Sequence, residues 1–394
     1  MPALAEVLGV DVRVLENAPP RSTVPNYAPG IKPDEWEQAE LLRRSFLARG
    51  VAATAMSVWS PAPPTSRVLQ ALAVIGADRS SEIVDSLGEL VDHYAVAACA
   101  LPPTEVYAEL LPLRAFAGQL LDRSTDPHHV DLAVAAGWVS NLLAVVSCDM
   151  GEHATARVWC ADAERRSQEA RHPQLRAWAL LTKSLIAMYQ GETRQAVTLA
   201  TKGREAVQVG SVAYAKLTSQ EMRAAALGGD AVRMAAARRR ASAAIAKLPP
   251  DAPETGAFSI SVGEDPPYTA TSLLYVGRFR EAAAATERVI GTVYQPERRE
   301  RGEHPSGYAR SLLIMALAQV GVGDLDEAVS VGHEALAGSR PVWPTMVLAG
   351  KLDRALNQRF QGSRQVGEYT ARYREVSQPL DGPAVALPTK DQDE

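Results

Sequence analysis

The sequence predicts an all-α fold built from stacked helical hairpins. Three observations predict it: a short glycine-centred pattern recurs five times, small side chains recur at fixed distances from each glycine, and long apolar helical stretches surround them. The chain has 394 residues, of which 46% are hydrophobic and 22% charged, the composition of a folded globular protein. It is long enough for one large core or two ordinary ones.

Two segments precede the expected hairpins. Residues 1–17 have the pattern of an amphipathic helix, and residues 18–66 hold most of the N-terminal prolines, which indicates a linker with a short helical segment. Acids and an arginine interrupt the apolar residues of the first segment, unlike a secretory signal. No run of about 18 apolar residues is present, so no membrane span is predicted. We expect a cytoplasmic protein.

Residues 67–375 carry the helical periodicity of a solenoid. Residues 80–123 predict one hairpin without a glycine turn. The glycine-centred pattern follows it, in the segments MGEHATA, QGETRQA, GGDAVRM, VGRFREA and VGDLDEA. Their turn glycines, spaced 40, 38, 48 and 46 residues apart, are Gly151, Gly191, Gly229, Gly277 and Gly323.

Each turn glycine is expected to end a first helix, because a left-handed backbone costs glycine no side-chain clash. An acid or threonine often follows and can accept from the free amides that open the second helix. Small residues stand seven before, five after and twelve after four of the five glycines, for example Ala144, Ala196 and Ala335. Small side chains let the two helices of a hairpin approach closely. The pattern therefore predicts architecture rather than catalysis.

Longer links interrupt the repeats. Residues 247–268 and 292–307 predict long loops between hairpins, and EDPPYT within the first of them could fold over an inner surface or form a rigid turn. The charged ERRERGEH stretch, 297–304, could grip an anion or remain solvated. Residues 376–394 lack periodicity and are expected to be a disordered tail.

The glycine turns and small positions resemble the tetratricopeptide repeat, a helix-turn-helix unit of about 34 residues. This resemblance implies a right-handed superhelix of degenerate tetratricopeptide-like hairpins. ALAEVLGVDVRVLEN, near the N-terminus, resembles the last helix of the DNA-binding domain in bacterial regulators of the xenobiotic-response-element type. Actinobacterial members of that family place a proline-containing linker and degenerate tetratricopeptide repeats after the domain. The helices that would enter the major groove would precede Met1, so most of that domain is expected to be absent.

No motif for a known catalytic site stands out: the chain has no phosphate-binding GxxxxGK[ST], dinucleotide-binding GxGxxG, GxSxG or HExxH motif. The DPHHVD segment could hold a metal, but adjacent histidines point to different faces of a helix, so a solvated helix start is favoured. Cys99, Cys148 and Cys160 form no CxxC pair and predict small core residues in a reducing compartment. We expect no metal and no cofactor.

The resemblance also implies which residues face the concave surface, where an extended trough would hold a partner. Positions 13 and 10 before each turn glycine are Trp138, Asn141, Trp178, Leu181, Lys216, Ser219, Glu264, Pro267, Arg310 and Leu313. Four further residues, at six and two before their glycines, are Arg223, Thr271, Tyr189 and Tyr275. Ten of these fourteen are favoured as ligand-binding residues, namely all except Leu181, Glu264, Pro267 and Leu313. This aromatic-then-basic lining could stack an apolar group and clamp a carboxylate. Each tryptophan could instead belong to the core between repeats.

The leading hypothesis is a ligand- or peptide-sensing regulatory protein that acts by binding, with a small molecule or short peptide as effector and a homodimer as one possible state. The first alternative is a biosynthetic enzyme built on such a sensor scaffold, and the second is a non-catalytic adaptor between proteins. A formal charge of -5 gives no global basic field for nucleic acid. We do not expect this chain to contact DNA alone.

Overall fold

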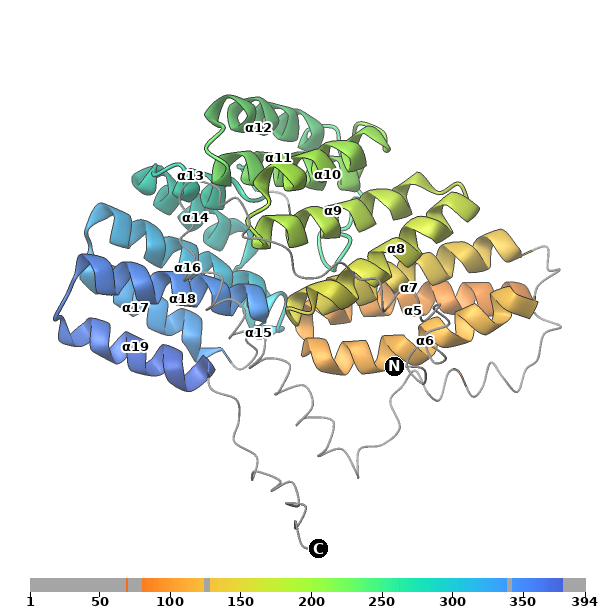
Figure 1. Cartoon of the computed structure of the whole chain (residues 1–394), viewed down its shortest axis with the longest axis horizontal. Coiled ribbons are helices and arrows are strands. Elements are labelled where there is room, and N and C mark those ends of the chain that lie inside the picture. Colours follow the sequence, from red (N-terminus) through yellow and green to blue (C-terminus); the bar gives the residue numbers. More distant parts are fainter. Residues whose placement is uncertain (1–68, 70–79, 124–127, 262, 339–341, 378–394) are drawn as a thin grey trace, which may run out of the picture.

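The computed structural model describes residue 69 and residues 80–123, 128–261, 263–338 and 342–377. These residues form 15 helices and no strand, which confirms the predicted all-α class (Figure 1). The segments expected at 1–17 and 18–66 lie outside the described residues, as does the tail from residue 378 on. The last helix extends to Ser377, two residues into the segment expected to be a tail.

Helices that follow one another along the chain pack as antiparallel pairs and also contact the next pair. The first four are α5 (Ser80–Ala100), α6 (Pro103–Arg123), α7 (His129–Asp149) and α8 (His153–Glu169). The next four are α9 (Pro173–Tyr189), α10 (Thr193–Glu205), α11 (Val212–Leu227) and α12 (Ala231–Ile245). The remaining seven are α13 (Thr269–Tyr275), α14 (Phe279–Val293), α15 (Pro296–Glu300), α16 (Pro305–Val322), α17 (Leu325–Ala337), α18 (Trp343–Arg359) and α19 (Arg364–Ser377).

The predicted turn glycines are confirmed, because each follows a first helix with a positive φ. The angles are 79° at Gly151, 76° at Gly191, 76° at Gly229, 74° at Gly277 and 105° at Gly323. An L side chain rarely adopts this backbone conformation. A sixth hairpin, α18 and α19, turns at Gly362 with φ 77°.

Small side chains fill the crossing of four of the five predicted hairpins, as the spacing predicts. Ala156, Ala196, Ala282 and Ala328, each five residues after a turn glycine, are fully buried. Position 234 holds a methionine, which is also buried at 5% exposure, so this crossing accommodates a longer flexible side chain. The Ser184 hydroxyl donates to the Ala196 carbonyl oxygen at 2.8 Å across one such crossing.

The expected capping by an acid occurs in two hairpins only. The carboxylate of Asp230 accepts from the Arg233 amide at 2.9 Å, and that of Asp324 accepts from the Glu327 amide at 3.1 Å. Glu152 and Glu192 occupy the same position without a side-chain cap. Short side chains reach back to the first turn, which explains the preference for Asp over Glu at this position.

Helix α7 is the one helix in the described ranges that is long and apolar enough to cross a membrane, by length and composition alone. Within the fold, 72% of its apolar window is buried. Neighbouring helices α6, α8 and α9 cover it. This is the environment of a core helix.

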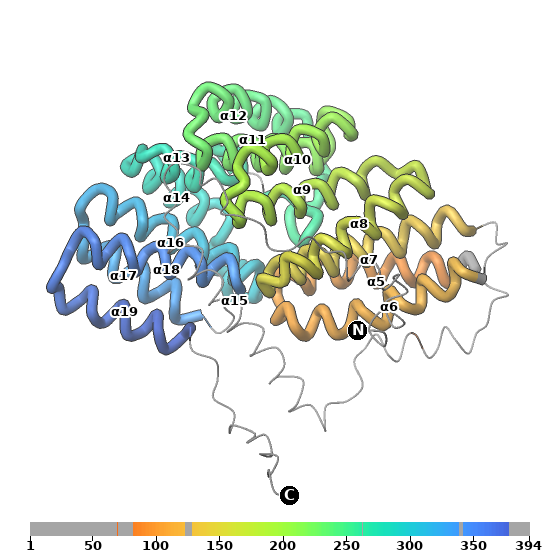
Figure 2. Tube along the Cα trace, viewed as in Figure 1, coloured from red at the N-terminus to blue at the C-terminus, as the bar shows by residue number. Residues whose placement is uncertain are grey.

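The hairpins follow an arc whose two ends approach each other (Figures 1 and 2). Helix α16 contacts α5, and α18 contacts α7. Trp343, 2% exposed at the start of α18, packs edge-on against His153, with ring centroids 4.6 Å apart, and against Tyr189, at 5.1 Å. These contacts close the inner surface into a partly enclosed space.

Candidate functional site

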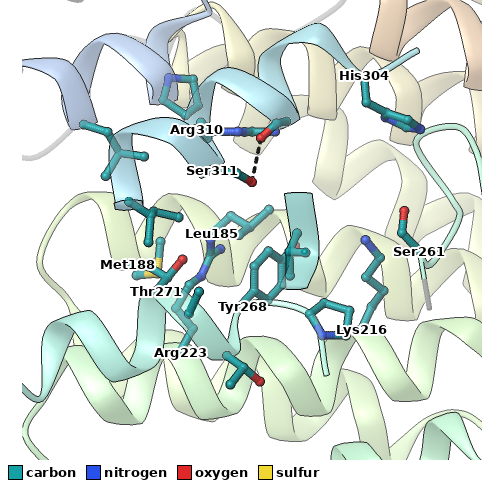
Figure 3. A pocket seen from close by; sticks show the side chains of 18 of the residues that line it. Leu185, Met188, Lys216, Arg223, Ser261, Tyr268, Thr271, His304, Arg310 and Ser311 are labelled. Atoms are coloured by element: carbon teal, nitrogen blue, oxygen red, sulfur yellow. Dashed lines mark hydrogen bonds between the residues drawn. The ribbon is translucent and has the colours of Figure 1, made fainter. Parts of the chain in front are cut away.

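The inner surface of the arc encloses a cavity of about 390 Å³. Its walls come from α5, α7, α9, α11, α13, α14, α16 and α18, so hairpins from both halves of the arc contribute (Figure 3). This volume lies within the range of about 300–1,000 Å³ that is usual for small-molecule sites.

Seven of the ten residues favoured from the sequence line this cavity. They occur at the predicted offsets before their turn glycines, so the repeat places them on the inner face of the first helices. The seven are Trp178, Tyr189, Lys216, Arg223, Thr271, Tyr275 and Arg310. Leu181 and Pro267, each ten residues before a turn glycine, also line it.

Three of the favoured residues lie elsewhere, in the packing between hairpins. The Asn141 amide donates to the Leu175 carbonyl oxygen at 3.1 Å, which ties α7 to α9. The Ser219 hydroxyl is buried and donates to the Ala215 carbonyl oxygen at 2.8 Å. Trp138 packs against Phe258, with ring centroids 4.7 Å apart, and so belongs to an aromatic contact beside the cavity.

The connection from α12 to α13 crosses the interior of the arc and forms one wall of the cavity. Its Ala257 amide donates to the Ala95 carbonyl oxygen of α5 at 2.7 Å, and Phe258 packs between Trp138 and Trp178. Asp265 anchors its far end by ion pairs with Arg238 and Arg288. The sequence left open whether EDPPYT in this connection folds over an inner surface or forms a rigid turn. The connection does fold inward, and it covers Trp138 and separates it from the cavity.

Three cations face the cavity without a paired acid. Lys216, Arg223 and Arg310 form no ion pair with any carboxylate in the described ranges, whereas other basic residues nearby, such as Arg204 and Arg240, pair with Glu221. The Arg223 guanidinium donates to the Gln220 side-chain oxygen at 3.0 and 2.6 Å, a neutral partner. The cavity wall therefore carries uncompensated positive charge.

Tyr268 lies between two of these cations. The Arg223 guanidinium stacks over its ring 3.9 Å from the centroid, and the Lys216 ammonium lies 5.9 Å from it (Figure 3). Burial acts to raise the pKa of the Tyr268 phenol, but Lys216, Arg223 and Arg310 outweigh it, so this pKa lies below its ordinary value. The three cations therefore favour the ionised form of this phenol.

Asp149, at the end of α7, lines the same cavity and interacts electrostatically with Arg310 without forming an ion pair. Burial raises its pKa from 3.8 to about 6, and the positive charge of Arg310 offsets part of that rise. Burial also raises the pKa of Tyr189 well above its usual range, so this phenol stays protonated. A carboxyl that titrates near neutrality makes the charge of the cavity sensitive to pH.

Two residues with a strained backbone line the same cavity. Tyr268 and His304 have φ of 66° and 49°, and each immediately precedes a helix, α13 or α16. Burial and the positive charge of Lys216 lower the pKa of the His304 imidazole, so it is neutral at pH 7. Non-glycine residues in the left-handed region cost free energy and cluster at functional sites.

Several wall residues were missed by sequence reasoning. Asp149 and Leu185 stand two and six residues before their turn glycines, the same offsets as Tyr189 and Arg223, so applying those offsets to every repeat would have found them. Lys351 and Arg354 belong to the sixth hairpin, which was not recognised. Tyr268 and His304 lie in or beside irregular connections, where no periodicity places a side chain.

Neither metal nor thiol chemistry is indicated. Within the described part of the chain, no three His, Cys, Asp or Glu residues are grouped to hold a metal ion, and His129 of DPHHVD contacts Glu169 at 2.6 Å. Cys148 and Cys160 are buried, as expected, whereas Cys99 is only partly buried. Cys99 and Cys148 both line the cavity. Burial raises the pKa of the Cys99 thiol to about 11, which keeps it protonated.

Comparison with known proteins yields no relative: no protein-family model matches the chain, and no curated protein matches it.

Proposed function

We propose that this chain is a ligand-sensing regulatory protein, which binds an anionic effector inside a right-handed superhelix of degenerate tetratricopeptide-like hairpins. Consecutive antiparallel pairs, left-handed turn glycines and small residues at each crossing support the repeat assignment. The cavity on the inner side supports the binding function. Its lining combines cations with tryptophan, leucine and methionine side chains, a combination suited to an amphipathic ligand.

One observation carries the proposal: Lys216, Arg223 and Arg310 line one partly enclosed cavity and form no ion pair with a carboxylate among the described residues. Charged groups removed from water cost free energy unless they are paired. A bound carboxylate would supply the missing partner, and a planar guanidinium can hold it with two parallel hydrogen bonds.

Regulation would follow from where the ligand sits. The walls of the cavity include α7 and α9 in the first half of the arc and α16 and α18 in the second. A ligand that contacts both halves favours one curvature over others, because it binds that state more tightly. We propose that this change in curvature alters a homodimer or a DNA-reading partner.

The test uses octanoate, indole-3-acetate and the tripeptide Ala-Leu-Leu as carboxylate probes, with octanol and the tripeptide amide as neutral controls. At a concentration of about 100 times Kd, a ligand stabilises the folded state by about 2.7 kcal/mol, which a thermal melt detects. We expect at least one carboxylate to raise the melting temperature and its neutral control not to. The double variant Trp178→Ala with Arg223→Ala should abolish the shift.

A matched double variant, Val232→Ala with Arg233→Ala, changes exposed positions of α12 and should keep the shift. If no carboxylate stabilises the wild-type protein, or if the cavity variant responds as the wild type does, the proposed function is wrong.

A second candidate function is an enzyme, favoured by the strained backbone at Tyr268 and His304. A phenol with a lowered pKa and a neutral imidazole could serve as an acid and base pair for an isomerisation or cyclisation. The test first captures a ligand from a host extract. The ligand is then incubated with wild-type protein or with Tyr268→Phe, and is recovered from each. Chemical change of the ligand by the wild type alone would support catalysis; an unchanged ligand in both would exclude it.

A further inference from the structure

A second hollow of about 570 Å³ adjoins the cavity, at the carboxyl ends of the same first helices. The two spaces share five lining residues, so they adjoin. The shared residues are Leu227, Tyr275, Leu348, Lys351 and Arg354.

Helix α16 runs along both spaces and sets their combined length. Gly307, Arg310, Ser311 and Ile314 line the first, while Leu317, Val320 and Gly321 line the second. From Gly307 to Gly321 is 321 − 307 = 14 residues, which at 1.5 Å per residue is about 21 Å. Taken together, the two adjoining spaces are much longer than a single ring-sized ligand, and we refer to them jointly as the channel.

The two ends of the channel differ in chemistry. Lys216, Arg223 and Arg310 face the first space. The second has an apolar side formed by Leu274, Phe279, Leu317 and Val320, and a polar side on α18 formed by Lys351, Arg354, Gln358 and Arg359. The basic residue Arg359 at the second space donates to the Gly321 carbonyl oxygen at 3.0 Å, so it already has a partner in the wall. Lys351 lies over the Tyr275 ring, 5.6 Å from its centroid.

The apolar side of the second space, formed by residues of α13, α14 and α16, discriminates between elongated ligands. A peptide there would bring amide groups, each of which needs a hydrogen-bond partner when it leaves water. A hydrocarbon chain needs none, and each buried methylene adds affinity. An extended hydrocarbon chain advances about 1.2 Å per carbon–carbon bond. An extended polypeptide gives the same value, because its three backbone bonds per residue span roughly 3.6 Å. A length of about 21 Å corresponds to roughly 17 bonds.

We propose that the ligand is a long-chain carboxylate of 16 to 18 carbons, with its carboxylate at Lys216, Arg223 and Arg310 and its chain running along α16 into the second space. This rests on the proposed function, since it assigns the anionic group to the same three cations. The ligand class is thus a fatty acid rather than a peptide or a compact aromatic acid.

The test is a titration of the full chain with octanoate, dodecanoate and hexadecanoate, each below its aggregation limit, by calorimetry. Affinity should rise by up to about fourfold per methylene and by at least 100-fold from octanoate to hexadecanoate. Leu317→Glu should remove most of this gain while leaving octanoate binding intact, because it places a charge in the second space only. Leu317→Met is the matched control and should keep the gain.

Two further variants test the direction of the chain. Arg223→Gln should weaken octanoate and hexadecanoate alike by at least tenfold. Lys351→Gln should change neither by more than about twofold, because Lys351 lies outside the three-cation cluster. A loss in Lys351→Gln with none in Arg223→Gln would overturn the orientation.

The outcomes separate this inference from the proposed function. Equal affinity for octanoate and hexadecanoate, or binding of the tripeptide alone, would overturn the long-chain ligand and leave an anion-binding sensor standing. Hexadecanol binding as tightly as hexadecanoate would instead overturn the role of the three cations, on which both proposals rest.

Discussion

Replacing Lys216 with methionine should stabilise the ligand-free protein and weaken ligand binding at once. Lys216 makes no hydrogen bond or ion pair in the described ranges, and its contact is the distant Tyr268 ring, 5.9 Å away. Methionine keeps most of the apolar stem and removes the charge. The repulsion among the three cations then falls.

The magnitude follows from the helix geometry. Lys216 and Arg223 are 223 − 216 = 7 residues apart on α11, which is about 10 Å along the axis. At an effective dielectric constant of about 20, two unit charges at that separation repel by about 1.7 kcal/mol. Loss of the weak contact with Tyr268 costs about 0.5 kcal/mol. The net gain in the free energy of unfolding is therefore about 1 kcal/mol.

Urea unfolding followed by circular dichroism measures this gain, and octanoate calorimetry measures the loss of affinity, expected to be about 10- to 100-fold. The stabilisation should shrink as sodium chloride rises from about 0.05 M to about 0.5 M, because salt screens the repulsion. Lys183→Met is the matched control: Lys183 pairs with Glu164, so its loss should not stabilise the protein. A less stable Lys216→Met variant, or one that binds octanoate normally, would refute the reasoning.

Two other substitutions test the pH dependence and the hairpin packing. A carboxyl whose pKa rises from 3.8 to about 6 on folding binds its proton more tightly in the folded state, so stability falls as pH rises between these values. Asp149→Asn should therefore stabilise the protein at about pH 7.5 and change little at about pH 4, by urea unfolding at both. Ala196→Leu, at a fully buried crossing, should cost about 1–3 kcal/mol in the same assay, while exposed Gln195→Leu should be nearly neutral.

The hairpins were predictable because their packing imposes a local pattern. A left-handed turn requires glycine, and a close crossing requires a small side chain, so Gly191 and Ala196 are visible in one sequence. The sixth hairpin obeys the same pattern in part: Gly362 follows Gly323 by 39 residues, and Ala355 stands seven before it. It could have been found with the five others.

The cavity was predictable only where the repeat governs side-chain direction. Trp178, Lys216 and Arg310 share one offset and all line it, but Trp138 shares that offset and does not. The difference arises from the connection that crosses the arc, which places Phe258 against Trp138. Which way an irregular connection folds depends on contacts distant in sequence, such as the Ala257 to Ala95 hydrogen bond, and no local pattern encodes them.

The closure of the arc was likewise not predictable, and a matched pair of glycine substitutions tests it. Gly151 and Gly277 have nearly the same backbone, with φ of 79° and 74°, so alanine adds about 1–2 kcal/mol of strain at either position. A β-carbon at Gly277 meets open space, whereas one at Gly151 lies 2.7 Å from the Trp343 ring. Gly151→Ala must therefore displace the tryptophan that packs the start of α18 against α8 and α9.

We expect Gly151→Ala to cost about 1–3 kcal/mol more than Gly277→Ala, the usual penalty of overpacking. Hydrogen exchange should show faster exchange in α18 in the Gly151 variant alone, because Trp343 begins that helix and contacts His153 and Tyr189. The cavity would then open where Trp343 contacts the first half of the arc, and octanoate should dissociate faster. Equal costs for the two substitutions would mean that the Trp343 contact does not hold the ends of the arc together, and that the inner surface is an open trough.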